Sequence, residues 1–258
     1  MRTNPFAKKN LLIPYFTLGD PNLNFTYDLV RAAFLSGADA VELGIPFSDP
    51  LADGPVIQSS HFRALTNNPD INLDHGFELV RKIRAEFNKP IIFMLATNLV
   101  FHFGINNFFV KANECGLAGV VIPDLSLEDS LQYYQLSKKY QVPLIYLASP
   151  LISEERIIKI TAKAEGFIYL ISSLGTTGER NSFSSTLKKV TDSIKKIKEI
   201  PVVVGFGISK KEHLEEIYQF ADGAIIGSYF VRIIENNLSD LDQAIKLISN
   251  DIKILKWS

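Results

Sequence analysis

One carboxylate interrupts a run of apolar residues that has the composition of a buried strand. Glu42 lies within Ala40–Gly44, and a carboxylate in such a strand is costly to bury unless it has a partner or a function. It predicts either a general acid or base whose pKa is set by its surroundings, or a buried structural ion pair. The loop that follows contains Asp49 and Asp53 among prolines and glycines. Such a stiff loop positions side chains at low entropic cost, although aspartate also forms turns there.

Glycine-rich turns near the end of the chain indicate a phosphate group on the ligand. Gly205-Phe206-Gly207-Ile208-Ser209 and Ile226-Gly227-Ser228 each complete an apolar run. Glycines let backbone N–H groups approach an anion, and the N-terminus of a following helix adds a favourable dipole. Segment 173–182 combines two glycines with several hydroxyl side chains, which fits either a lid over the substrate or a plain flexible loop. With Glu42, these turns predict acid–base chemistry on a phosphorylated, partly apolar small molecule.

The elements that must position these residues alternate regularly between apolar strand-like runs and amphipathic helix-like segments. Strands are expected at Leu11–Thr17, Ala40–Gly44, Pro90–Ala96, Gly119–Ile122, Leu144–Ala148, Phe167–Ser172, Pro201–Gly205 and Gly223–Ile226. Helices are expected at Leu23–Ser36, Leu73–Phe87, Ile105–Glu114, Leu127–Tyr140, Glu154–Ala164, Ser184–Glu199 and Lys210–Phe220, with helical stretches to the end. Eight such units predict an α/β fold, a single (β/α)8 TIM barrel over residues 1–258, rather than an open doubly wound sheet. In this fold the active site lies at the carboxyl ends of the strands, where Glu42 and the glycine turns fall.

The composition excludes several other classes of protein. The net charge of −1 leaves no basic excess for a nucleic acid, and the single cysteine, Cys115, is expected to be a small buried apolar residue. The histidines are widely spaced, so no metal site is expected, and His61, His75 and His213 are expected on helices with partly exposed side chains. No apolar run is long enough to cross a bilayer, and we expect a cytoplasmic protein.

The longest motif, Val41 to Gln58, resembles the signature of the tryptophan synthase α subunit family, Glu-Leu-Gly-x-Pro-Phe-Ser-Asp-Pro-x-Ala-Asp-Gly-Pro-x-Ile-Gln. Thr17-Leu18-Gly19-Asp20-Pro21 is similar to its first-strand motif, and Gly175-Thr176-Thr177-Gly178-Glu179-Arg180 is similar to its lid. The two glycine turns resemble its phosphate loops, so the resemblance covers nearly the whole chain. It implies retro-aldol cleavage of indole-3-glycerol phosphate into indole and glyceraldehyde 3-phosphate, with indole passed to a β subunit.

The resemblance also implies roles for individual residues. Asp53 would polarise the indole N–H, while Glu42 would protonate the indole carbon and take the proton of the glycerol hydroxyl. Asp49 and Pro50 would lie in a loop that faces the β subunit and takes part in closure. The implied substrate-binding residues are Tyr169, Thr177, Gly178, Gly207, Gly227 and Ser228.

The implied assembly is an α2β2 heterotetramer in which pyridoxal phosphate belongs to the β subunit and this chain carries no cofactor. One alternative is a weakly active subunit that chiefly activates and gates the β subunit. Another is the indoleglycerol-phosphate synthase barrel, which needs a catalytic lysine on a strand, and no strand of this sequence ends near a lysine.

Overall fold

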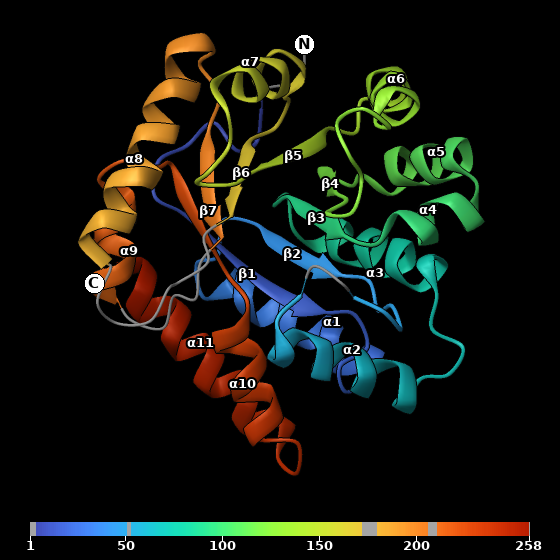
Figure 1. The fold of residues 1–258 in the computed structure, drawn as a ribbon. Helices are drawn as coiled ribbons and strands as arrows, with labels where there is room; N and C mark the ends of the chain where they lie inside the picture. The colour runs from blue at the N-terminus through green and yellow to red at the C-terminus, as the bar shows by residue number, and fades with distance from the viewer. Residues whose placement is uncertain (1–3, 51–52, 172–179, 206–210, 258) are drawn as a thin grey trace.

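The chain folds into a closed barrel of parallel strands. The computed structural model describes residues 4–50, 53–171, 180–205 and 211–257, and these residues form eight strands and eleven helices. The strands pair in chain order and β8 closes on β1, while the helices surround the barrel (Figure 1). The strands are β1 (Leu11–Thr17), β2 (Val41–Gly44), β3 (Ile91–Met94), β4 (Gly119–Val121), β5 (Leu144–Ala148), β6 (Ile168–Ile171), β7 (Val202–Gly205) and β8 (Gly223–Ile226). The predicted (β/α)8 barrel is therefore confirmed.

The helices form the outer layer and several begin at a side-chain cap. Asn22 Oδ1 accepts a hydrogen bond from the Phe25 N–H at 2.9 Å, which satisfies an orphan donor at the start of α1. No helix in the described ranges is long and apolar enough to cross a membrane. The helices are α1 (Leu23–Leu35), α2 (Pro55–Asn67), α3 (Leu73–Glu86), α4 (Thr97–Phe103), α5 (Ile105–Cys115), α6 (Leu131–Tyr140), α7 (Glu154–Lys163), α8 (Arg180–Ile197), α9 (Lys211–Tyr218), α10 (Ser228–Asn236) and α11 (Leu241–Trp257).

Several helices differ from the predicted ranges: α2 and α4 were not predicted, α6 begins four residues later than predicted, and α8 begins four residues earlier. Helix α2 begins at Pro55, since proline is tolerated in the first turn of a helix and need not mark a loop. Helix α4 is separated from α5 by Gly104, whose φ of 86° breaks the helical path. Helix α6 begins later than expected because the Ser126 hydroxyl accepts from the Asp129 N–H at 3.0 Å and closes a turn.

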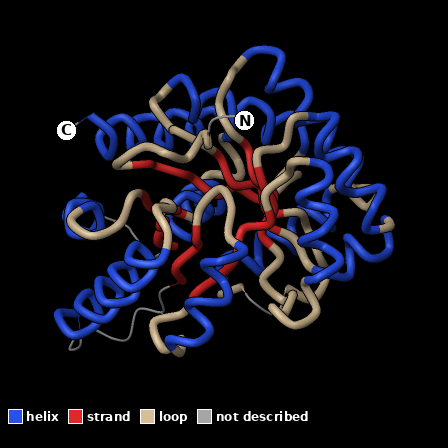
Figure 2. Tube along the Cα trace, turned by 90° about the horizontal axis from the view of Figure 1, so that it is seen from above, coloured by secondary structure: helices blue, strands red, loops and turns tan. Residues whose placement is uncertain are grey.

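Strand alternation divides the core into two layers. Leu11, Ile13 and Tyr15 of β1 belong to the cluster inside the barrel, whereas Leu12 and Phe16 belong to the cluster between strands and helices. Figure 2 shows the strands at the centre and the helices around them. On β2, Val41 and Leu43 belong to the outer cluster, so the intervening Glu42 points into the barrel.

Candidate active site

Glu42 occupies the interior of the barrel without a polar partner. It is 0% exposed, its register neighbours are Tyr15 and Ile92, and neither carboxyl oxygen has a hydrogen-bond partner among the residues that the structure describes. Burial, with a smaller contribution from Asp53, raises the pKa of Glu42 to about 8. Glu42 is therefore not held in an ion pair within the described chain, and at neutral pH it is a protonated carboxylic acid that can donate to a ligand.

Asp53 lies in the loop between β2 and α2, where backbone contacts hold it. Its N–H donates to the Pro50 carbonyl at 3.1 Å, and its carbonyl accepts from Gln58 Nε2 at 2.8 Å. Burial raises the pKa of Asp53 to about 6. Two carboxyl groups whose pKa values differ in this way divide the roles of acid and anion between them at neutral pH.

A cavity opens at the carboxyl ends of β1, β2 and β3. Its wall is mostly apolar, with carboxylates at Asp49, Asp53 and Asp124 and polar side chains at Tyr15 and His61. The other lining residues are Ile45, Phe47, Pro50, Met94, Leu95, Ala96 and Pro123. Glu42 is not among the lining residues, but its register partner Tyr15 on β1 is, so Glu42 lies directly beside the cavity. The space suits an apolar ring that also presents a polar group.

Two tyrosines, Tyr15 and Tyr169, lie inside the barrel, and glycines on the neighbouring strands make room for them. Tyr169 on β6 is 8% exposed, and burial, followed by the charge of Glu42, raises its pKa well above its ordinary value. A Cβ at Gly205 would lie 2.3 Å from Tyr169 Cε1, and one at Gly44 would lie 1.9 Å from Tyr15 Oη. Both strand-end glycines are therefore required for tyrosines to occupy the interior next to the carboxylates.

The predicted phosphate-binding residues Gly227 and Ser228 lie at the start of α10. Ser228 is the first residue of the helix and Gly227 is its N-cap, so free N–H groups of the first turn face the end of β8. A Cβ at Gly227 would make only ordinary contacts, the nearest at 3.5 Å to Tyr15. Helix N-termini with this arrangement generally favour anions, so a phosphate site at Gly227 and Ser228 stays a prediction.

The structure places the remaining predicted site residues in two groups. Asp49 is exposed and Pro50 is half-buried, and both line the mouth of the cavity next to Asp53. Thr177, Gly178 and Gly207 lie outside the described residues, as do most of the predicted lid and the turn after β7.

The predicted environment of one residue, His61, is wrong. His61 was expected to be partly exposed on a helix, but it is 5% exposed and lines the cavity, with Nε2 3.6 Å from Asp53 Oδ2. The buried face of α2 consists of Ile57, Ser60, His61 and Ala64. That i, i+3, i+4, i+7 spacing is the signal that identifies His61 as an inward residue.

The expected environments of Cys115, His75 and His213 are confirmed. Cys115 is buried, as predicted, and burial raises the pKa of its thiol to about 11, so it is a core residue and not a nucleophile. His75 and His213 are half-buried on α3 and α9. Within the described ranges, no three histidine, cysteine or acidic side chains come together as a metal site would require.

The fold and the site define a class of protein. A closed (β/α)8 barrel with a buried acid, a second carboxylate and a helix N-terminus after the last strand has the features of an acid–base enzyme of the TIM-barrel type.

Comparison with known proteins narrows this class. The family model described as tryptophan synthase alpha chain matches residues 2–256. The chain is 45% identical to the tryptophan synthase alpha chain of Alkaliphilus metalliredigens, over 89% of this chain and 85% of that protein. It is 41% identical to that of Methanocaldococcus jannaschii, over 90% and 82%. The tryptophan synthase complex of Pyrococcus furiosus contains a similar chain, with a TM-score of 0.85, 32% identity and coverage of 96% and 98%. The chain therefore belongs to the tryptophan synthase alpha chain family.

Proposed function

We propose that this chain cleaves indole-3-glycerol phosphate into indole and glyceraldehyde 3-phosphate. Membership of the family supports this lyase activity. The observation that carries the proposal is the pair of carboxyl groups, in which Glu42 is buried with a pKa of about 8 and Asp53 has a pKa of about 6. A retro-aldol reaction needs an acid for the carbon that becomes free and a base for the hydroxyl that becomes a carbonyl.

Glu42 performs both proton transfers in this proposal. As a carboxylic acid it donates its proton to the indole carbon that bears the glycerol chain, which gives the N-protonated indolenine, a cation, and a Glu42 carboxylate. The carboxylate then takes the hydroxyl proton, the electrons of that O–H bond form the aldehyde, and the C–C bond electrons restore the aromatic ring. The acid is thereby regenerated, and no oxidant or other reactant is needed.

Asp53 supplies a carboxylate for the indole nitrogen. A carboxylate that accepts a hydrogen bond from the indole N–H favours the electron shift toward the indolenine. The apolar cavity wall would hold the ring, and Tyr169 would lie against it. The first turn of α10, at Gly227 and Ser228, would bind the phosphate.

The proposed binding set extends to residues outside the described ranges. By family resemblance, Gly178 and Gly207 contribute phosphate contacts, and Thr177 on the lid orients Asp53. We also propose that residues 1–258 act as one domain, in the cytoplasm, and without a cofactor of their own.

A β subunit is the proposed partner. A solved structure from Pyrococcus furiosus, 34% identical with a TM-score of 0.87, is described as showing mutual activation of a tryptophan synthase α2β2 complex. By analogy, indole released here passes to a β subunit that carries pyridoxal phosphate. Asp49 and Pro50, at the mouth of the cavity, are the proposed relay between that partner and Asp53.

The test is the release of indole and glyceraldehyde 3-phosphate in equal amounts from indole-3-glycerol phosphate, measured with and without the β subunit. We expect slow cleavage by the chain alone and faster cleavage in the complex, because a partner that favours the closed site raises the competent fraction. No cleavage alone combined with activation of the β subunit would favour the gating alternative. No cleavage under either condition would refute the lyase proposal.

A further inference from the structure

His61 is held in one tautomer by the backbone of the loop after β2. The Phe47 N–H donates to His61 Nδ1 at 3.1 Å. A nitrogen that accepts a hydrogen bond carries no proton, so the ring proton of neutral His61 is on Nε2. Burial lowers the pKa of His61 to about 4, and the ring is therefore neutral at physiological pH.

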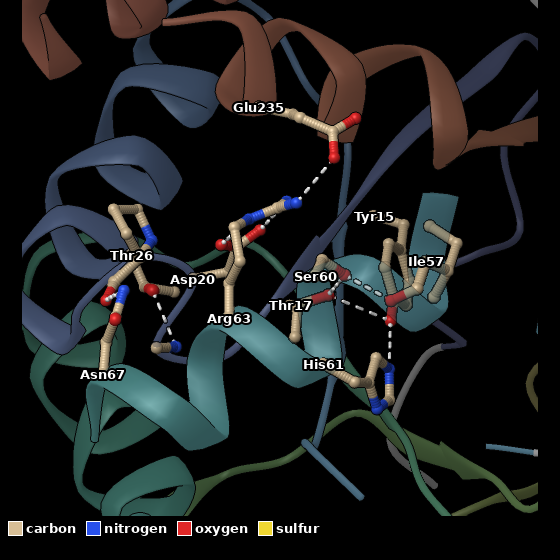
Figure 3. A network of polar contacts seen from close by, with 12 residues as sticks. Tyr15, Thr17, Asp20, Thr26, Ile57, Ser60, His61, Arg63, Asn67 and Glu235 are labelled. Carbon is tan, nitrogen blue, oxygen red and sulfur yellow. Dashed lines mark hydrogen bonds and ion pairs between the residues drawn. The ribbon is translucent and has the colours of Figure 1, made fainter. Parts of the chain in front are cut away.

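The Nε2–H of His61 faces the cavity. Tyr15 Oη lies 3.1 Å from Nε2 (Figure 3), and Asp53 Oδ2 lies 3.6 Å from the same nitrogen. The ring thus donates to the Tyr15 hydroxyl, while the Asp53 carboxylate lies beside the same nitrogen, beyond hydrogen-bond distance. Because it is neutral, it brings no charge that would form a full ion pair with Asp53.

The Tyr15 hydroxyl also accepts a hydrogen bond from Thr17 on β1, and α2 holds Thr17 through Ser60. Thr17 Oγ1 lies 3.3 Å from Tyr15 Oη and 2.6 Å from Ser60 Oγ, and Ser60 donates to the Ile57 carbonyl at 2.7 Å. Ser60 and His61 are consecutive residues of α2, so this helix controls both contacts of the phenol (Figure 3). Helix α2 also begins two residues after Asp53, which ties the helix to the loop that carries the carboxylate.

We propose that His61 is a positioning residue, whose Nε2–H fixes the Tyr15 hydroxyl beside the Asp53 carboxylate in the cavity. The kinetic part of this proposal rests on the proposed lyase function, whereas the tautomer and its contacts do not. At 3.6 Å the Nε2–H makes no hydrogen bond to Asp53, but the positive end of this N–H dipole beside a carboxylate favours the ionised form. His61 therefore helps keep Asp53 an anion in a site where burial opposes its charge.

Several other titratable groups face Asp53 and set the background against which His61 acts. Burial and the charge of Asp53 raise the pKa of Tyr15 well above its ordinary value, so Tyr15 remains a neutral phenol. The titratable groups around the carboxylate are Tyr15, Glu42, Asp49, His61, Asp124 and Tyr169. None of them is a cation, and His61 is the donor whose contact with Asp53 the structure records.

The first test reads the tautomer directly and needs no turnover. Two-bond ¹H–¹⁵N spectra of the imidazole-labelled chain report which ring nitrogen of each of the four histidines carries the proton, and the His61→Gln spectrum assigns the signal of His61. We expect an Nε2–H ring from pH 6 to 8 whose Nε2–H resonance shifts in Tyr15→Phe. A proton on Nδ1, a charged ring at pH 7, or no shift in Tyr15→Phe would overturn the proposal.

The second test separates the two contacts of the ring by side-chain length. In His61→Asn, the amide oxygen takes the place of Nδ1 and keeps the Phe47 contact, but no donor reaches Tyr15 or Asp53. In His61→Gln, the amide nitrogen takes the place of Nε2 and keeps the cavity donor. We expect kcat to fall by up to about tenfold in His61→Asn with KM little changed, which is the upper range for the loss of one hydrogen bond between neutral groups. We also expect the acid limb of its pH profile to move to higher pH.

The Gln variant decides how the loss is interpreted. We expect His61→Gln to retain at least about a third of the parent kcat and the parent acid limb, since it restores a donor at the same place. Equal losses in both variants, or a greater loss in Gln than in Asn, would mean that His61 only anchors the Phe47 backbone. Parent activity in both variants would also refute the role. If the parent chain itself releases no indole, the lyase proposal fails while the tautomer measurement still stands.

Discussion

Replacing Glu42 with glutamine is expected to make the protein more stable and almost inactive. The substitution keeps the shape of the side chain and replaces one neutral polar group with another at pH values where Glu42 is protonated. Turnover should fall by about 10²- to 10⁴-fold, the loss that follows removal of a positioned general acid or base. The gain in stability follows from the position of Glu42 inside the barrel, where no described residue bonds its carboxyl oxygens.

The size of the stability gain follows from the pKa of Glu42. Folding raises that pKa from 4.5 to about 8, so the folded chain binds this proton more tightly than the unfolded chain does. Stability contributed by Glu42 is therefore present below pH 4.5 and is lost as the pH rises to about 8, by about 1.4 kcal/mol per unit. At pH 7, roughly 2.5 units above the unfolded pKa, the loss is about 3 kcal/mol. Glu42→Gln has no carboxylate and avoids this loss.

Urea unfolding of the parent and Glu42→Gln at pH 5, 6, 7 and 8 tests this reasoning. We expect the difference in free energy of unfolding to be less than about 1 kcal/mol at pH 5 and to widen by about 1.4 kcal/mol with each unit up to pH 8. The control is Glu114→Gln, which changes an exposed glutamate on α5 and should not show this widening. A difference that does not grow with pH would refute the buried, protonated Glu42, and indole release at the parent rate would refute its catalytic role.

Three further predictions concern the surroundings of the site. Asp53 must be ionised to hold the indole N–H, so kcat/KM should fall as the pH drops through about 6, and a profile that is flat from pH 5 to 7 would contradict this. Gly44→Ala should lower the free energy of unfolding by about 1–3 kcal/mol, because the added Cβ would meet the Tyr15 hydroxyl. Gly54→Ala is the control: its Cβ would have no atom within 4 Å, so it should change the free energy of unfolding little in the same urea experiment. Arg63→Met should lower the free energy of unfolding by about 3–5 kcal/mol, since it leaves the buried Asp20 carboxylate without its two hydrogen bonds at 2.8 and 2.9 Å. Lys82→Met breaks only an exposed pair with Glu78 and should lower it by less than about 1 kcal/mol. Equal effects of the two substitutions would contradict the argument.

Much of the barrel could be predicted because its strands are apolar on both faces. The predicted ranges Leu11–Thr17, Leu144–Ala148 and Gly223–Ile226 match the observed strands to the residue. A parallel strand that is buried on both sides must be a continuous apolar run, and such runs are visible without a structure. Helix α2 was harder to predict because its start at Pro55 follows a loop rich in proline.

The candidate site was only partly predictable. Glu42 and the loop of Asp53 stood out, because a carboxylate inside an apolar strand and a stiff loop at a strand end are unusual in the sequence alone. Tyr15 and His61 did not stand out. Tyrosine is common in strands and histidine is common on helix surfaces, and neither type shows by itself which partner it will meet.

The sequence by itself determined which residues lie in the barrel, which strand ends carry polar groups, and which family the chain resembles. Each of these depends on the order and spacing of residue types along the chain. Only the tertiary structure decided the pKa values of about 8 and about 6 at Glu42 and Asp53 and the tautomer of His61. The reason is that burial and hydrogen bonding depend on distances between residues far apart in the chain. Tyr15 and His61, 46 positions apart, meet at 3.1 Å only because α2 packs over the end of β1.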